Sequence, residues 1–271
     1  INTELFYEKE VLIVHDAMYG SSVNTYSQVL AGTKISTIPI RSYRDPLFGG
    51  HAPEPVEKHL LPLMEKVRSV GAFLGIANDG DGDRIALVDE RGKFVNAQLV
   101  YVLLLYHLLK NRGIKDGIVV INELILQEKV IFGGEESGGY GIVHFLPERD
   151  GLFSGLNILE LLLLKDKSLS QIIEEIFKDY GSAYYRRYDM RAEEDKKKKL
   201  EILKAYPPEN LSGYKVKTIN TKDGLKLVFE NDGWILFRAS GTEPLIRVYV
   251  EMPMEEEVER VLQEGIKLFE G

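Results

Sequence analysis

Between Glu10 and Glu90 the sequence alternates apolar runs of strand length with stretches of helical spacing. The strand-like runs begin at Val11, Lys34 and Ala72, and helix patterns separate them. Strands that alternate with helices form parallel-type sheets covered on both faces. The third run ends on a loop of aspartates and glycines, so the pattern predicts this loop at the carboxyl edge of the sheet, where such sheets bind ligands.

A second α/β stretch begins near Asn96. It contains a long apolar helix pattern, strand-like runs at residues 116–120 and 129–134, and, after the tripeptide "RDG", an amphipathic helix from Leu152. The junction of Val120 and Ile121 joins a strand pattern to a helix pattern without turn residues or a cap. We therefore expect a disordered loop segment to be missing from the sequence at 120/121.

From about Ser182 the pattern changes to strand-like runs separated by Asp-Gly and other glycine turns, followed by an amphipathic helix. This is typical of an antiparallel meander. The sequence therefore predicts an α/β protein with two related α/β domains, 1–95 and 96–181, whose sheets are mixed but mainly parallel. A C-terminal α+β domain, 182–271, is expected to hold a four-stranded antiparallel sheet and a helix.

Composition narrows the function classes. The 271 residues are 44% hydrophobic, which fills the cores of two or three domains. The net charge is −8 and the only basic block, residues 195–199, is typical of a solvated helix face, which argues against nucleic acid. The absence of cysteine excludes disulfides, thiolate zinc sites and thiol catalysis. The apolar runs are shorter than the roughly 18 residues of a bilayer span, and the sequence has no signal-peptide pattern. We therefore expect a cytoplasmic protein without a membrane partner. Its oligomeric state is expected to be monomeric or dimeric.

The loop "NDGDGDR" has the residues of a metal site. Asp79, Asp81 and Asp83 are separated by single glycines, so the backbone can curl and bring three carboxylates to one hard cation. An EF-hand calcium loop is the main rival, but Arg84 occupies the position of its turn glycine and the flanks have strand patterns. The other alternative is an acidic turn that binds no metal. We favour Mg²⁺ with room for a phosphate oxygen.

The loop "GGEESGGYG", residues 133–141, places glycines around Glu135, Glu136 and Ser137. Such a loop approaches a ligand closely and offers carboxylate and hydroxyl acceptors that suit a polyol such as a sugar. A flexible acidic turn explains the same residues equally well.

The third loop, "RASGTEPLIR", spans residues 238–247. Its two arginines offer guanidinium groups, and its Ser-Gly-Thr turn offers backbone amides and hydroxyls, a combination that binds phosphate. The alternative is a tight hairpin whose Ser and Thr hydroxyls are satisfied internally. Together the three loops predict a phosphosugar site.

These motifs resemble the α-D-phosphohexomutase superfamily, the phosphoglucomutases and phosphomannomutases. "DGDGDR", "GGEESGG" and "RASGTEP" occur in the family's order, and "HDAMYGSS" and "GGHAPEP" resemble family segments of the first unit. The resemblance covers nearly the whole chain. It implies that the chain corresponds to the second, third and fourth of four family domains.

The resemblance also implies roles for individual residues. Asp79, Asp81 and Asp83 would bind Mg²⁺, with Arg84 as the catalytic residue beside the phosphoryl group in transfer. Glu135 and Ser137 would bind sugar hydroxyls. The non-reacting phosphate of the substrate would be bound by Arg238, Ser240, Gly241, Thr242 and Arg247. In the family reaction phosphate moves between C1 and C6 of a hexose through a phosphoserine, with hexose 1,6-bisphosphate as intermediate and activator.

The sequence departs from the family in three respects. The phosphoserine segment occurs nowhere in these residues, so we weigh an active mutase whose serine domain lies outside them against a non-catalytic phosphosugar-binding protein. The family's lysine-bearing loop would fall at the 120/121 junction and is missing. Some relatives carry a histidine at the position of Gly139, so no general base is assigned. The segment "GEES" resembles the glucose-specific relatives more than the mannose/glucose or glucosamine enzymes, which favours glucose phosphate.

Overall fold

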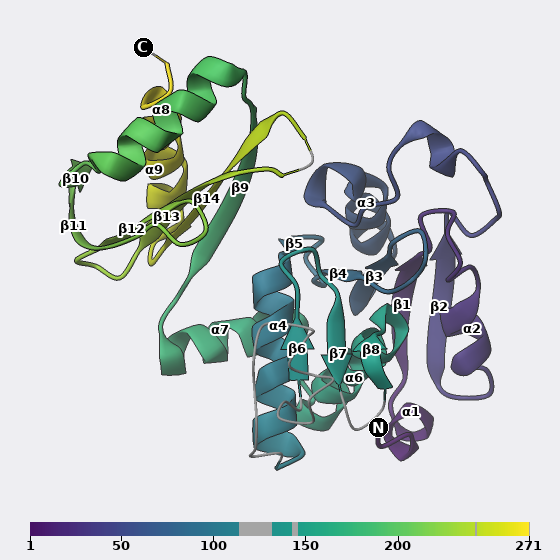
Figure 1. The fold of residues 1–271 in the computed structure, drawn as a ribbon. Coiled ribbons are helices and arrows are strands. Elements are labelled where there is room, and N and C mark those ends of the chain that lie inside the picture. The colour runs from purple at the N-terminus through teal and green to yellow at the C-terminus, as the bar shows by residue number, and fades with distance from the viewer. Residues whose placement is uncertain (114–131, 143–145, 242, 271) are drawn as a thin grey trace. The chain divides into compact units, whose positions relative to one another are not determined.

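The computed structural model describes residues 1–113, 132–142, 146–241 and 243–270 (Figure 1). The chain forms two compact units, unit 1 over Ile1–Glu174 and unit 2 over Glu175–Gly271. The expected boundary at 95/96 falls inside unit 1, and the boundary at 181/182 falls just after the start of unit 2. The three-domain division stays a prediction, and the expected missing loop at 120/121 lies outside the described residues.

The N-terminal half of unit 1 contains the predicted alternation of strands and helices (Figure 1). The strands are β1 (Val11–Asp16), β2 (Ile35–Ile40), β3 (Leu74–Asn78), β4 (Ile85–Val88) and β5 (Phe94–Val95). The helices are α1 (Glu4–Glu8), α2 (Thr25–Val29) and α3 (Leu61–Val70), with short 3-10 turns η1 (Phe48–Gly50) and η2 (Glu57–His59). The five strands form one sheet in the order β2-β1-β3-β4-β5. The predicted mixed α/β class is confirmed, because β2, β1 and β3 are parallel whereas β4 and β5 are antiparallel.

Helix α3 illustrates how local sequence sets an element. Pro62 stands in its first turn, where a missing N–H costs nothing, and Gly71 ends it in the left-handed conformation at φ 62°. Leu63 and Val67 are the fully buried residues of its apolar face. They pack with Val88 and other sheet residues in one core cluster, so α3 covers one face of the sheet.

The second half of unit 1 begins with helix α4 (Ala97–Tyr106), which starts as predicted because the Asn96 side chain accepts the Leu99 amide. A π-helical turn, η3 (His107–Asn111), continues it. The other described elements are strands β6 (Phe132–Gly134), β7 (Tyr140–Ile142) and β8 (Leu146–Arg149) and helices α6 (Gly151–Lys165) and α7 (Leu169–Tyr180), of which α7 runs past Glu174 into unit 2. The described strands β6, β7 and β8 are antiparallel. The predicted strand at 116–120 lies outside the described residues.

A buried carboxylate ties unit 1 together. Glu160, inside the apolar helix α6, accepts hydrogen bonds from His107 Nε2 at 2.9 Å, from the Asn2 amide at 2.6 Å, and from Arg112. Burial alone would raise the pKa of Glu160, but these three donors outweigh it and lower the pKa to about 2. The network joins the start of the chain to η3 and α6.

Unit 2 is an antiparallel sheet covered by two helices. Its elements are β9 (Tyr184–Arg191), α8 (Glu194–Ala205), β10 (Asn210–Leu211), β11 (Tyr214–Asn220), β12 (Leu225–Phe229), β13 (Trp234–Ala239), β14 (Leu245–Met252) and α9 (Glu255–Lys267). The strand order is β10-β11-β12-β13-β14-β9. The predicted antiparallel sheet is confirmed but holds six strands, not four. Strand β9 was missed because its Arg- and Tyr-rich sequence is exposed at most positions, so it lacks a strong apolar pattern. Strand β10 was missed because it has only two residues.

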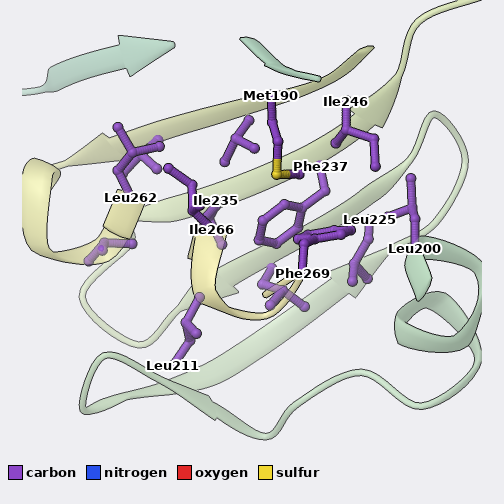
Figure 2. Close-up of a cluster of buried hydrophobic side chains, with 14 of the residues drawn as sticks. Met190, Leu200, Leu211, Leu225, Ile235, Phe237, Ile246, Leu262, Ile266 and Phe269 are labelled. Carbon is purple, nitrogen blue, oxygen red and sulfur yellow. The ribbon is translucent and has the colours of Figure 1, made fainter. Parts of the chain in front are cut away.

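Alternation along the strands of unit 2 builds its core. Ile235, Phe237, Val248 and Val250 are fully buried on one face of the sheet. Figure 2 shows Phe237 beside Phe269, at 5.4 Å between ring centroids, in a cluster that also contains Leu262 and Ile266 of α9. The opposite face is less buried and carries Trp234 and Leu236 beside the exposed Arg238.

Among the described residues, no helix combines the length and apolar character that a bilayer crossing requires.

We predict that Glu160→Gln lowers the free energy of unfolding at pH 7 by about 2 kcal/mol, because the buried donors lose their charged partner. The folded-state pKa lies below the ordinary value of 4.5, so this stabilisation is complete above pH 4.5 and is lost as the pH falls toward 2. Urea denaturation followed by circular dichroism at a series of pH values measures both effects. Glu65→Gln on the exposed side of α3 is the matched control. Equal pH profiles for both variants would contradict the assignment.

Candidate functional site

The aspartate loop forms the turn between β3 and β4, which pair through Asn78 and Ile85. Asp79 is buried, Asp83 is half-buried and Asp81 is exposed. The three side chains each bring one carboxylate oxygen within 4.8 Å of the others. The loop therefore gathers three hard oxygen ligands close together, and the Asp81 side chain among them is exposed.

Asp79 is the anchor of this loop. Its Oδ1 accepts the backbone amides of Gly82 and Arg84, each at 3.0 Å. Gly82 has φ +87°, a conformation that glycine adopts without strain. Burial raises the pKa of Asp79 to about 7; the Arg84 amide opposes this shift, and the charges of Asp83 and Asp81 add to it. A bound cation would relieve the repulsion, so the donor set fits Mg²⁺.

Arg84 lies beside two of these carboxylates. Its Nε is 3.6 Å from Asp79 Oδ2 and 3.8 Å from Asp83 Oδ1. The Nε atom is buried and has no hydrogen-bond partner among the described residues. The guanidinium therefore offsets the charge of the triad without a hydrogen bond from Nε.

Two buried polar residues support the loop from inside the sheet. Asn78 donates through Nδ2 to the Arg84 carbonyl at 2.9 Å, and its Oδ1 lies 3.2 Å from His15 Nε2. Burial lowers the pKa of His15 to about 4, against the opposing effect of Asn78. His15 is therefore neutral at pH 7, with Nε2–H donating to Asn78. Neither residue was singled out from the sequence, although each is a polar residue within a strand-like run.

Two turns from the N-terminal half hold the glycines of the loop. The Ser21 amide donates to the Gly80 carbonyl at 2.9 Å. A Cβ on Gly20 would lie 2.6 Å from that same carbonyl oxygen, and a Cβ on Gly80 would lie 2.9 Å from Pro53 Cγ. Glycine is needed at both positions because the segments approach closely.

The loop at residues 133–141 lies directly against the aspartate loop. The Ile85 amide donates to the Gly138 carbonyl at 2.9 Å, and Arg84 forms an antiparallel bridge with Gly139. The Gly151 amide at the start of α6 donates to the Gly82 carbonyl at 3.1 Å. Segments more than 50 residues apart in sequence therefore share main-chain hydrogen bonds.

Glu135 and Ser137 lie within this second loop. Ser137 Oγ donates to Glu135 Oε2 at 3.1 Å. The same carboxylate oxygen accepts Arg149 Nη1 at 2.6 Å, and Arg149 Nη2 lies 2.6 Å from Asp83 Oδ2. Arg149 thus bridges the two loops. In the sequence Arg149 was noted only as the first residue of "RDG" and was given no role. The next residue, Asp150, caps α6 by accepting the Phe153 amide.

The third loop is the β13–β14 turn of unit 2. Arg238 and Arg247 are direct cross-strand partners, so both side chains leave the same face of the sheet. Arg238 Nε lies 3.0 Å from Asp223 Oδ2, and Arg247 Nη2 lies 3.1 Å from Glu243 Oε2. The Nε of Arg247 is buried and has no hydrogen-bond partner among the described residues.

Some polar groups of the turn form hydrogen bonds within the turn. The Ser240 amide donates to the Leu245 carbonyl at 2.9 Å, and Ser240 Oγ accepts the Glu243 amide at 3.3 Å. Nothing would contact a Cβ on Gly241, so that position faces open space. Thr242 lies outside the described residues. Two guanidinium groups and an open turn can bind an anion such as phosphate.

Three family models match the chain in order. The model of the phosphoglucomutase/phosphomannomutase alpha/beta/alpha domain II matches residues 2–92, that of domain III matches residues 90–180, and that of the C-terminal domain matches residues 190–267.

Individual proteins agree with these matches. A phosphoglucomutase/phosphomannomutase of Thermococcus kodakarensis is 30% identical over 100% of this chain and 63% of its own length. A phosphoglucosamine mutase of Methanocaldococcus jannaschii is 32% identical over 85% of this chain and 57% of its own length. The crystal structure of a candidate phosphomannomutase from Thermus thermophilus superposes with a TM-score of 0.81 at 30% identity, covering 98% of this chain and 62% of that one. The chain spans less than two thirds of the length of each.

We predict that the affinity of the chain for Mg²⁺ falls as the pH drops below 7, by up to about tenfold per pH unit, because the metal displaces a proton from Asp79. The direction follows from the raised pKa of about 7, since below that value the carboxyl holds its proton. Titration calorimetry between pH 5.5 and 8 measures the effect, and Asp81→Asn, which removes a ligand at an exposed position, is the control for binding elsewhere. An affinity that stays constant over this range would show that Asp79 is not a ligand.

Proposed function

Because the chain belongs to the phosphoglucomutase/phosphomannomutase family, we propose that it provides the metal, sugar and phosphate sites of a phosphohexomutase. This enzyme is an isomerase that moves phosphate between C1 and C6 of a hexose. The observation that carries the proposal is the bridge from Asp83 through Arg149 to Glu135, with 2.6 Å at each end. A metal site and a sugar site so close can act on one phosphosugar. The division into domains 1–95, 96–181 and 182–271 belongs to the same proposal.

In this proposal Asp79, Asp81 and Asp83 hold Mg²⁺, which when bound supplies positive charge that offsets the charge of a phosphoryl group. Arg84 adds a second positive charge at the same point, since its Nε is within 4 Å of two of the carboxylates. Charge placed in advance where negative charge develops lowers the barrier to transfer.

Glu135 and Ser137 bind sugar hydroxyls in this scheme. The carboxylate accepts and the hydroxyl both donates and accepts, so the pair suits vicinal hydroxyls. Their present mutual hydrogen bond, at 3.1 Å, would be exchanged for bonds to the sugar. The loop at residues 133–141, the sugar loop of this proposal, thereby selects the orientation in which one hexose carbon faces the metal.

In this proposal the phosphate that does not react is bound by five residues of the β13–β14 turn and its flanking strands: Arg238, Ser240, Gly241, Thr242 and Arg247. Arg238 pairs with Asp223 and Arg247 with Glu243, and all four side chains are partly exposed. A dianion competes well for guanidinium groups that are paired at the surface. Anchoring one phosphate positions the other for in-line transfer.

Phosphate then passes from a phosphoserine to the hexose, and hexose 1,6-bisphosphate is the intermediate and activator. Glucose phosphate is the favoured hexose on the segment "GEES". Mannose phosphate is possible, and the M. jannaschii relative, a phosphoglucosamine mutase, makes glucosamine phosphate the strongest competitor. We propose a cytoplasmic location. The second candidate function is non-catalytic phosphosugar binding, which the same metal, hydroxyl and phosphate groups would support.

We predict that the complete gene product converts glucose 1-phosphate to glucose 6-phosphate with Mg²⁺ and a trace of glucose 1,6-bisphosphate. Asp81→Asn should lower kcat by about a hundredfold or more while the fold stays intact, because the side chain is exposed. Coupled assays with glucose, mannose and glucosamine 1-phosphates rank the substrates. If none of the three is turned over while the chain still binds glucose 1,6-bisphosphate, the non-catalytic function holds.

A second prediction concerns the phosphate loop. Arg247→Gln should raise KM for the hexose phosphate by roughly 10- to 100-fold, the loss expected for a charged hydrogen bond. Arg186→Gln is the matched control, because Arg186 is on the neighbouring strand β9 and pairs instead with Glu259 of α9 at 2.8 Å. Steady-state kinetics of both variants decides the case. Equal KM values would remove Arg247 from the phosphate site.

A further inference from the structure

The guanidinium of Arg149 is shared between two carboxylates that belong to different loops. Nη2 lies 2.6 Å from Asp83 Oδ2, and Nη1 lies 2.6 Å from Glu135 Oε2. We propose that Arg149 is a positioning residue that couples cation binding at the aspartate loop to the setting of Glu135 in the sugar loop. This inference rests on the proposed metal and sugar sites, but neither site by itself requires a coupling between them.

The backbone holds Arg149 firmly in this place. It is the last residue of β8 and pairs with Gly141 of β7, and the next residue, Asp150, caps helix α6. Strand pairing on one side and a helix start on the other leave the Arg149 backbone little freedom.

Gly139 provides the space for the side chain. A Cβ at Gly139 would lie 2.5 Å from Arg149 Cδ and 3.3 Å from its Cγ. Gly139 is not in the left-handed region, so glycine is required here for space and not for conformation. The aliphatic part of Arg149 therefore lies across Gly139, and the guanidinium reaches both loops.

The bound cation and Arg149 compete for the same carboxylate, Asp83, and this competition couples the two loops. Without a metal, Arg149 offsets part of the repulsion among the three aspartates by pairing with Asp83. A cation bound by the triad also binds the Asp83 carboxylate, so it weakens the Asp83–Arg149 ion pair. Arg149 then pairs mainly with Glu135. By linkage, any change in how strongly Glu135 holds Arg149 must change the affinity of the metal.

The test is a double-mutant cycle on Mg²⁺ affinity, measured on the full chain by titration calorimetry with the metal alone. Arg149→Gln should tighten Mg²⁺ binding by on the order of tenfold, because a positive charge beside the site is removed. Glu135→Gln should weaken binding, because Arg149 then pairs with Asp83 alone. In the Arg149→Gln background the effect of Glu135→Gln should shrink, with a departure from additivity of about threefold or more.

A matched control cycle uses Arg91 and Glu174, an exposed ion pair at 3.0 Å in the same unit. It has the same charge types but contacts none of the three aspartates in any described ion pair. Its two substitutions should change Mg²⁺ affinity additively. The control removes the general effect of net charge from the interpretation.

Gly139→Ala provides a test that leaves every charge in place. The added Cβ should push Arg149 off its path and reduce the coupling between Glu135 and the metal, as Arg149→Gln does. Melting curves of each variant without Mg²⁺ check that the fold is kept.

The outcomes separate the inference from the function on which it rests. If the unaltered chain binds no Mg²⁺, the proposed metal site itself is wrong. If Mg²⁺ binds but the Arg149/Glu135 cycle is as additive as the control cycle, the metal site stands and the coupling is overturned. Weaker Mg²⁺ binding in Arg149→Gln would also overturn it, since Arg149 would then only support the loop.

Discussion

The placement of a carboxylate inside the molecule is the constraint from which the rest of unit 1 follows. Asp79 is 5% exposed at the end of a fully buried strand, and two further carboxylates follow within four residues. Burying a charge without partners is costly, so the surrounding chain has to supply donors. The amides of Gly82 and Arg84 supply two, and the guanidinium groups of Arg84 and Arg149 add positive charge.

The compensation extends beyond the loop in both sequence directions. His15 and Asn78 form a buried polar chain through the sheet that ends on the Arg84 carbonyl. The loop at residues 133–141 and the start of α6 contribute main-chain hydrogen bonds from the other side. A site assembled this way resists collapse when it is empty, because its donors are held by backbone and not by the ligand.

Much of this could be predicted where the signal is local. The spacing of Asp79, Asp81 and Asp83 indicated convergence because the glycines between them let the backbone curl within a few residues, and the oxygens do lie within 4.8 Å of one another. Strand and helix patterns located β1 to β4, α3 and α9, because apolar periodicity is also a signal carried by neighbouring residues. Strand β9 and residues His15, Asn78 and Arg149 were missed. Their importance comes from partners 6 to 66 residues away, or, for β9, from pairing with β14.

The sequence by itself determined the α/β class, the antiparallel C-terminal sheet and the chemical character of each loop, because apolar period and turn residues act over a few neighbours. The sequence predicted that the loops act together, but only the tertiary structure decided which groups join the aspartate loop to the loop at residues 133–141. That decision depends on Gly138 and Gly139 meeting Ile85 and Arg84 through the main chain, and on one guanidinium reaching two carboxylates. Main-chain groups carry no residue identity, so no pattern in the sequence records which segments they join.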